Sequence, residues 1–283
     1  METTVAVFEV PENNFKVSFV NGRIEVPTDE ISMRAFRMLG HLPALLRPDA
    51  QRGLMLSFGT GIATGSLDTH AIPYIDAVDL SAEQLKAAEL YWEENYNVLR
   101  SPRLHLHVED GRNFLLQTPH RYDIITTDAT HPSNTSSWAL FTREFYVSVA
   151  DRLTPDGVFV QWMPFHSLLE SDYKMILRTF ASVFPNATLW YTGGSHTLLV
   201  ATPQPLTDAD LERMAQMVEQ NPIALADLQR ASLVRAYFAM DTAALLAYVG
   251  DGPLSTDDNA FFLPYNDDVE RIRQQIQAAQ SVR

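Results

Sequence analysis

The first 28 residues alternate between apolar and polar side chains. Two runs, 5–10 and 15–20, are separated by a polar segment at 11–14, and Asn21-Gly22 precedes a third run at 23–26. A period of two is typical of strands that bury one face, and Asn-Gly is typical of a tight hairpin turn. Residues 1–28 are therefore predicted to form a small N-terminal β-hairpin domain.

Residues 29–205 follow a different pattern. An amphipathic segment runs from Asp29-Glu30 to about Leu46, and Pro43 is expected to kink or break it. Apolar runs then predict strands at 53–58, 74–80, 104–108, 122–128, 158–163, 187–191 and 197–201. Helical patterns lie between them, at about 62–70, 81–97, 111–117, 142–153 and 171–184. This alternation predicts a mostly parallel sheet with helices on both faces.

The last two predicted strands are separated only by residues 192–196. A parallel crossover needs about a dozen residues or more, so these strands are expected to form an antiparallel hairpin. The predicted fold class is α/β, with a seven-stranded sheet that ends in this hairpin. Residues 206–283 are helical by pattern, with Thr207 and Asp210 as a capping-box pair, and form a predicted C-terminal extension.

Composition and charge narrow the classes of function. The chain has 283 residues and a formal charge of −14, which argues against nucleic acid, because that partner requires clustered basic side chains. The chain has no cysteine, which excludes thiol catalysis, disulfides and Cys-ligated metal centres. It shows neither a signal-peptide pattern nor an apolar run approaching about 18 residues. We therefore expect a cytoplasmic protein with no membrane segment.

The strongest chemical signal lies where predicted parallel strands end. The first strand runs into a loop with Gly59 and Gly61, which lets the backbone turn sharply and approach a ligand, although Thr64 replaces the third glycine of a dinucleotide fingerprint. The next three strands end at Asp79, Asp110 and Asp128. Carboxyl ends of parallel strands share one crevice, and Asp79 is placed to accept hydrogen bonds from ribose hydroxyls. The pattern predicts a nucleoside pocket.

These residues resemble the spermidine synthase family, the polyamine aminopropyltransferases. The resemblance covers about residues 5–205 in collinear order, closest to the divergent spermidine-synthase-like branch. Its motifs are Asp29-Glu30, 38–43, Gly59-Thr60-Gly61, Val78-Asp79-Leu80, Glu109-Asp110-Gly111, 123–128, 141–146 and 157–160. The resemblance implies a Rossmann-like, S-adenosylmethionine-methyltransferase-like fold for residues 29–205, behind a β-hairpin domain at 1–28 and before a helical extension at 206–283.

The resemblance also implies a reaction. Decarboxylated S-adenosylmethionine would be the donor, a small-molecule amine the acceptor, and the protein a homodimer. Asp79 would bind the ribose, Asp110-Gly111 the adenine, and Asp128 would take the proton from the attacking amine, with Gly59, Thr60, Gly61 and Glu25 also at the donor. No metal is required, because the sulfonium is already a good leaving group.

The acceptor end departs from the family pattern. Thr60 and His131 stand where the family has carboxylates for ammonium groups, Glu25 replaces a glutamine, and residues 192–196 replace the acceptor loop. Met33 stands where an aromatic residue is expected. Losing carboxylates from ammonium sites is expected to weaken recognition of the usual diamine. His131 is a candidate acceptor contact or second acid/base, and His166 and Gln161 are further candidate substrate contacts.

Two alternatives follow from these departures. Neutral Thr60 would tolerate the carboxylate of intact S-adenosylmethionine, so the reaction could be methyl or 3-amino-3-carboxypropyl transfer. Alternatively, the chain could be a non-catalytic homologue that binds a nucleoside or a polyamine. The identity of the acceptor stays open.

Overall fold

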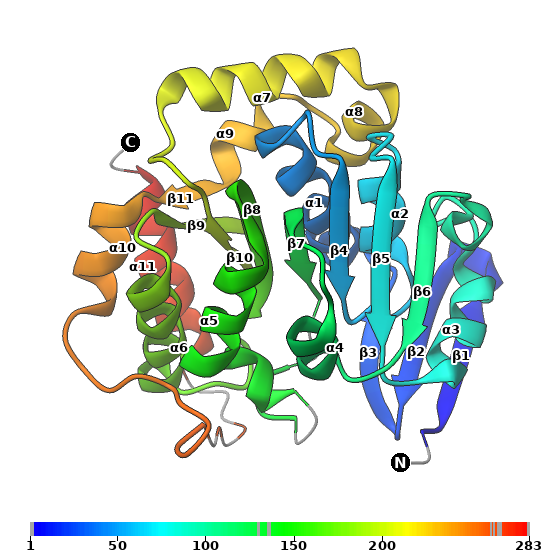
Figure 1. Ribbon diagram of the computed structural model, residues 1–283, viewed down its shortest axis with the longest axis horizontal. Helices are drawn as coiled ribbons and strands as arrows, with labels where there is room; N and C mark the ends of the chain where they lie inside the picture. Colours follow the sequence, from blue (N-terminus) through cyan, green and yellow to red (C-terminus); the bar gives the residue numbers. More distant parts are fainter. Residues whose placement is uncertain are drawn as a thin grey trace.

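The computed structural model describes residues 3–128, 131–134, 137–260, 262, 264 and 268–281. The chain begins with a three-stranded antiparallel sheet of β1 (Val5–Val10), β2 (Phe15–Val20) and β3 (Arg23–Pro27). Asn21 and Gly22 both have positive φ in the β2–β3 turn, as the Asn-Gly pair predicted. In Figure 1 this small sheet lies beside the lower ends of β5 and β6.

A second, eight-stranded sheet forms the centre of the molecule, in the order β11-β9-β10-β8-β7-β4-β5-β6. Its strands are β4 (Arg52–Leu56), β5 (Tyr74–Asp79), β6 (Leu104–Val108), β7 (Tyr122–Thr127), β8 (Leu153–Pro164), β9 (Ala187–Gly193), β10 (His196–Ala201) and β11 (Phe238–Met240). Strands β6, β5, β4, β7 and β8 are parallel, and β10, β9 and β11 pair antiparallel. The predicted α/β class and the closing hairpin are confirmed, and β11 extends the seven predicted strands by one.

Helices cover both faces of the central sheet. They are α1 (Glu30–Leu46), α2 (Ile62–Asp68), α3 (Ala82–Ala88), α4 (Gly111–Gln117), α5 (Arg143–Arg152), α6 (Glu170–Val183), α7 (Asp208–Gln220), α8 (Pro222–Leu228), α9 (Leu233–Tyr237), α10 (Thr242–Val249) and α11 (Val269–Ser281). Asp29 caps α1 and Thr207 closes the predicted capping box of α7.

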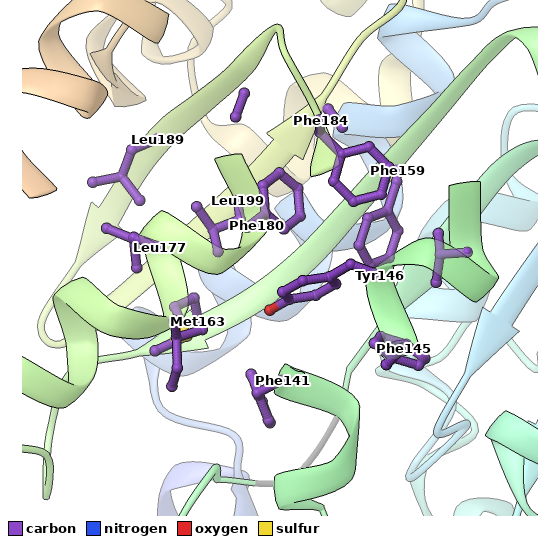
Figure 2. Close-up of a cluster of buried hydrophobic side chains, with 14 of the residues drawn as sticks. Phe141, Phe145, Tyr146, Phe159, Met163, Leu177, Phe180, Phe184, Leu189 and Leu199 are labelled. Atoms are coloured by element: carbon purple, nitrogen blue, oxygen red, sulfur yellow. The ribbon is translucent and has the colours of Figure 1, made fainter. Parts of the chain in front are cut away.

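Strand alternation divides the hydrophobic core into two layers. On β4, Leu54 and Leu56 face the layer of α4, α5 and α6, whereas Met55 faces the layer of α1 and α2. The first layer is rich in aromatic rings, and Figure 2 shows Tyr146 among Phe159 and Phe180. Because both faces of the sheet are buried, its strands appear in the sequence as apolar runs rather than alternating ones.

The C-terminal extension wraps around the β9 edge of the sheet. Helices α7, α8 and α9 contribute to the layer of α1, strand β11 pairs with β9, and α10 and α11 contribute to the layer of α5 and α6. In Figure 1, α7 lies along the top, away from the small sheet. We keep 1–28, 29–205 and 206–283 as the proposed division of the chain, with residues 206–283 supplying core side chains to both layers.

Two local predictions were wrong: the extent of the helix predicted over 81–97, and the break that was one of the two outcomes expected at Pro43. The α-helix predicted over 81–97 ends at Ala88 and is followed by a 3-10 turn over Glu89–Tyr91. The Asn95 amide Nδ2 donates to the carbonyls of Ala88 and Thr60, both at 2.9 Å, and ties this segment to the glycine loop. Pro43 does not break α1, which continues until Arg47 N–H bonds the Pro43 carbonyl at 2.9 Å.

A buried polar network fastens the extension to α1. Asp227 of α8 accepts hydrogen bonds from His41 Nε2 and from Arg37, each at 2.8 Å, and from the Tyr96 hydroxyl. His41 Nδ1 lies 2.8 Å from Nε2 of His70. His41 is fully buried and Asp227 is 7% exposed, so these bonds replace water for groups that could not otherwise be solvated.

Candidate active site

The carboxyl ends of four adjacent parallel strands form one continuous edge. The order β7-β4-β5-β6 places Asp128, the glycine loop, Asp79 and Asp110 next to one another along it. Main-chain bonds extend the pairing into the loops: Asp128 N–H donates to Leu56 at 3.1 Å, and Glu109 N–H donates to Asp79 at 2.9 Å. The predicted placement of these four strand ends along one edge is confirmed, and the shared nucleoside pocket stays a prediction.

The glycine loop turns sharply between β4 and α2. Gly59 and Gly61 have φ of +58° and +78°, conformations that favour glycine, and a Cβ at Gly61 would lie 2.7 Å from the Phe58 ring. Open space surrounds the Cβ position of Gly59, so a ligand can approach its backbone. Ser57 also has positive φ, 65°, which places backbone strain at the entrance to the loop. Thr60, between the two glycines, is 4% exposed.

Asp79 holds this loop in place from the end of β5. Its carboxylate accepts hydrogen bonds from the Gly59 N–H at 2.9 Å and the Ser81 N–H at 3.0 Å. Burial raises its pKa, and these bonds oppose that shift. The adjacent Leu80 is 58% exposed, so it offers an apolar surface beside the carboxylate that the sequence reading did not single out.

Asp110 marks the far end of the edge. Its carboxylate accepts a hydrogen bond from the Asn113 N–H at 3.0 Å, so it caps α4, which begins at Gly111. The neighbouring Arg112 makes a two-pronged ion pair with Asp257, with both N–O distances at 2.8 Å. A residue of the C-terminal extension therefore reaches this end of the site.

Asp128 follows β7 and faces a second carboxyl group from the small sheet. Burial raises its pKa to about 7, and the negative charge of Glu25 on β3 raises it further. Burial also raises the pKa of Glu25 to about 7, opposed by a hydrogen bond from Asn134 Nδ2 at 3.3 Å and by the charge of Arg23. The site thus holds two carboxyl groups whose pKa values are both raised to about 7.

A cavity of about 320 Å³ is lined in part by Glu25, and we call it the histidine cavity. Its wall consists of Arg23, Ile24, Glu25, Pro27, Ser32, Phe36, His131, Asn134, Trp162, His166, Ser195 and His196. Two predicted substrate contacts, His131 and His166, therefore lie in one wall. Glu25, predicted at the donor, also lies there, while Gln161 does not.

The hydrogen bonds of His131 fix its ring. Nε2 donates to the His166 carbonyl at 2.6 Å, and Nδ1 lies 2.7 Å from the Ser133 hydroxyl. Burial lowers the pKa of His131 to about 4. Both ring nitrogens are already bonded and the ring is neutral, which favours a place in the wall over proton transfer.

Gln161 is fully buried. Its Nε2 donates to the Leu140 carbonyl at 2.9 Å, and Oε1 has no hydrogen-bond partner among the described residues. Its role in substrate binding stays a prediction.

Sequence reasoning missed several wall residues. The indole N–H of Trp162 donates to His196 Nδ1 at 3.1 Å, and Arg23 comes from the small sheet. They belong to β8, β10 and β3, which are far apart in the chain. No spacing signal links them, so only the folded structure could bring them together.

The described part of the chain contains no group of three or more His, Asp or Glu side chains placed to hold a metal ion. None of its helices has the length and apolar character needed to cross a membrane.

Comparison with known proteins agrees with this architecture. A sequence model of the spermine/spermidine synthase domain matches residues 33–193, more than half of the chain. The chain therefore belongs to the spermine/spermidine synthase family, and the resemblance inferred from its motifs is confirmed. A polyamine aminopropyltransferase of Thermotoga maritima is 25% identical over 221 residues, covering 74% of this chain and 73% of that protein. The predicted enzyme class agrees with that relative's name.

Two solved structures show the same fold. A spermidine synthase in complex with the transition-state analogue AdoDATO has a TM-score of 0.74 at 20% identity, covering 88% of this chain and 85% of its own. Human methyltransferase-like protein 13 in complex with SAH has a TM-score of 0.53 at 22% identity, covering 68% of this chain and 90% of its own. The Rossmann-like, methyltransferase-like architecture is therefore confirmed.

Proposed function

We propose that this protein is an aminopropyltransferase that moves the aminopropyl group of decarboxylated S-adenosylmethionine to an amine. The observation that supports this most is the position of Asp128 at the end of β7, next to β4 with its glycine loop and within electrostatic range of Glu25 in the histidine cavity, with a pKa raised to about 7. Asp79 would bind the ribose hydroxyls, and Asp110 with Gly111 would lie at the adenine. A homodimer and a cytoplasmic location stay predictions.

The proposed reaction is one displacement. The amine nitrogen attacks the methylene carbon next to the sulfonium, a C–N bond forms, and the C–S bond breaks with its electron pair moving to sulfur. An amine with a pKa near 10 is protonated at neutral pH, so Asp128 takes one proton from it to make the nitrogen a nucleophile. Methylthioadenosine leaves as a neutral thioether, and the alkylated nitrogen keeps its remaining protons and the positive charge.

Product analysis tests the proposal. The protein, decarboxylated S-adenosylmethionine and a panel of amines are incubated, and mass spectrometry follows methylthioadenosine and the alkylated amine. Release of both products in equal amounts supports aminopropyl transfer. Binding of methylthioadenosine without turnover of any amine would favour a non-catalytic nucleoside-binding homologue instead.

One observation favours a second candidate, a transferase that uses intact S-adenosylmethionine. Thr60 is buried and uncharged within the glycine loop, so this loop offers no carboxylate to the donor's ammonium group. Calorimetry with the two donors separates the candidates. Tighter binding of decarboxylated S-adenosylmethionine argues against the second candidate, and tighter binding of the intact donor argues for it.

Replacing Asp79 by alanine is expected to weaken methylthioadenosine binding by about 10- to 100-fold, because a hydrogen bond to a carboxylate contributes about 1.5–3 kcal/mol. The substitution also releases Gly59 from its 2.9 Å bond. Calorimetry measures the dissociation constant. Glu83→Gln is the control and should bind normally, because Glu83 is exposed on α3 and pairs with Lys86. Equal affinity of the two variants would remove Asp79 from the ligand site.

The pH dependence of transfer follows from the two carboxyl groups. Asp128 must be ionised to accept a proton, so kcat at saturating donor and amine is expected to rise with pH through an inflection near 7. Because the charge of Glu25 raises the pKa of Asp128, Glu25→Gln should move this inflection to lower pH. Glu9→Gln, exposed on β1, should leave it in place. An inflection that moves upward in Glu25→Gln would contradict the assignment.

A further inference from the structure

The wall of the histidine cavity is poor in negative charge. Glu25 is its one carboxylate and Arg23 its one permanent cation among the residues that the structure describes. The acidic Asp29 lies near His196 and influences its titration, but its Oδ1 is engaged by the N–H groups of Ile31 and Ser32 at the start of α1. This balance is unusual in a protein with a net charge of −14.

The three imidazoles of the wall are neutral at physiological pH. Burial lowers the pKa of His131 and of His196 to about 4 and also lowers that of His166. His196 Nδ1 accepts the indole N–H of Trp162, so the ring hydrogen is on Nε2. The Nε2–H of His196 makes no hydrogen bond to another described residue. It is therefore available as a hydrogen-bond donor to a ligand. Donors attract carbonyl, hydroxyl and carboxylate oxygens, and they do not bind ammonium groups.

The positive charge of Arg23 reaches into the cavity. Its guanidinium donates to Asn134 Oδ1, and Asn134 in turn donates to Glu25. The charge of Arg23 lowers the pKa of both Glu25 and His131, which places it within electrostatic range of the wall. A second ammonium group on the substrate would therefore meet a cation and lose its hydration without gaining a carboxylate.

The carboxylate of Glu25 does not provide a site for a second ammonium group, because it belongs to the reacting end of the cavity. Its charge raises the pKa of Asp128, so it lies close to the base and to the amine that reacts there. The two carboxyl groups together suit one nitrogen. The remaining wall presents imidazole, indole, amide and guanidinium groups.

We propose that the acceptor carries a single amine and, at its far end, a group that accepts hydrogen bonds from Arg23 and His196, rather than a second ammonium. This inference rests on the proposed aminopropyl transfer. The far group can be an anion or an uncharged oxygen, because both accept hydrogen bonds from the donors of the cavity wall. The reacting nitrogen gains the aminopropyl carbon and loses a proton to Asp128, whichever far group the acceptor carries.

Three amines with the same four-carbon chain test this: 4-aminobutan-1-ol, 4-aminobutanoate and 1,4-diaminobutane. With decarboxylated S-adenosylmethionine as donor, kcat/KM for the alcohol, the carboxylate or both is expected to exceed that for the diamine by about tenfold or more. Comparing kcat/KM for the alcohol and the carboxylate shows whether the far group is uncharged or anionic. A diamine that reacts as fast as both would overturn the inference while leaving aminopropyl transfer intact. Failure of every amine, with these three and longer polyamines supplied, would instead overturn the proposed function.

Variants of Arg23 give an independent readout. Arg23 is exposed on a β-strand, so the protein is expected to fold normally without it. Arg23→Gln should raise kcat/KM for the diamine relative to the alcohol by about threefold or more, and Arg23→Lys, which keeps the charge, should not. If Arg23→Gln leaves the ratio of diamine to alcohol unchanged, Arg23 does not select against the second ammonium and the inference fails.

Discussion

Replacing Asp128 by asparagine is expected to lower kcat by roughly 10²- to 10⁴-fold, the usual contribution of a positioned base. Asparagine keeps the shape of the side chain but cannot take a proton. Methylthioadenosine binding should stay within about twofold of the unmodified protein, because Asp79 and the glycine loop are untouched. Steady-state kinetics and calorimetry measure the two effects. Turnover close to that of the unmodified protein would remove Asp128 from the role of base.

Asp128→Asn is expected to lower activity but to raise thermal stability above neutral pH. Burial raises the pKa of Asp128 from 3.8 to about 7, so the folded protein holds this proton more tightly than the unfolded chain. The proton held by Asp128 stabilises the folded state fully below about pH 4, and this stabilisation is lost as the pH rises through 7. Asparagine is uncharged throughout, so Asp128→Asn should have a higher Tm than the unmodified protein at pH 8.

Asp156→Asn is the matched control for both measurements. Asp156 is exposed near the start of β8, so the same chemical change should alter neither kcat nor Tm. An Asp128→Asn protein that is inactive and also less stable at pH 8 would indicate a structural role for the carboxylate rather than a catalytic one.

Replacing Asp227 by alanine is expected to destabilise the fold by about 3–5 kcal/mol, because it leaves buried partners without their shared acceptor. His41 and Arg37 each lose a bond of 2.8 Å, and Tyr96 loses a third bond. For a chain of this size the loss corresponds to a fall in Tm of roughly 10 °C. Thermal and urea unfolding at neutral pH measure it.

A second aspartate of the extension provides the control. Asp208 pairs with Arg235 at 2.9 Å, but both side chains are more than half exposed, so Asp208→Ala should cost less than about 1 kcal/mol. Equal losses in the two alanine variants would show that the buried network does not anchor the extension. Asp227→Asn, which keeps one acceptor oxygen, should fall between them.

The elements of the fold were largely predictable because their signals are local. Apolar runs marked β4, β5 and β7, and Asp29 and Thr207 marked the starts of α1 and α7 through caps that involve only neighbouring residues. The end of α3 was not predictable in this way. The chain there passes into a 3-10 turn, and a distant side chain, Asn95, bonds both Ala88 and Thr60.

The shared edge of strand ends was predictable for a related reason. Parallel strands must place their carboxyl ends on one edge, so Asp79, Asp110 and Asp128 could be brought together from strand order alone. The histidine cavity was not, because it joins the small sheet, the loop after β7 and the β9–β10 turn. His131 and His166 could be suspected from their positions after strands, but Arg23 and His196 could not.

The amino-acid sequence by itself therefore determined the α/β class, the family motifs and the residues at the strand ends, since periodicity, capping and strand direction are properties of short segments. Only the tertiary structure decided the charge of the histidine cavity, the coupling of Glu25 to Asp128 and the anchoring of the extension through Asp227. Those features depend on burial and on contacts between distant segments. Both arise when the chain packs, and neither is encoded in the spacing of neighbouring residues.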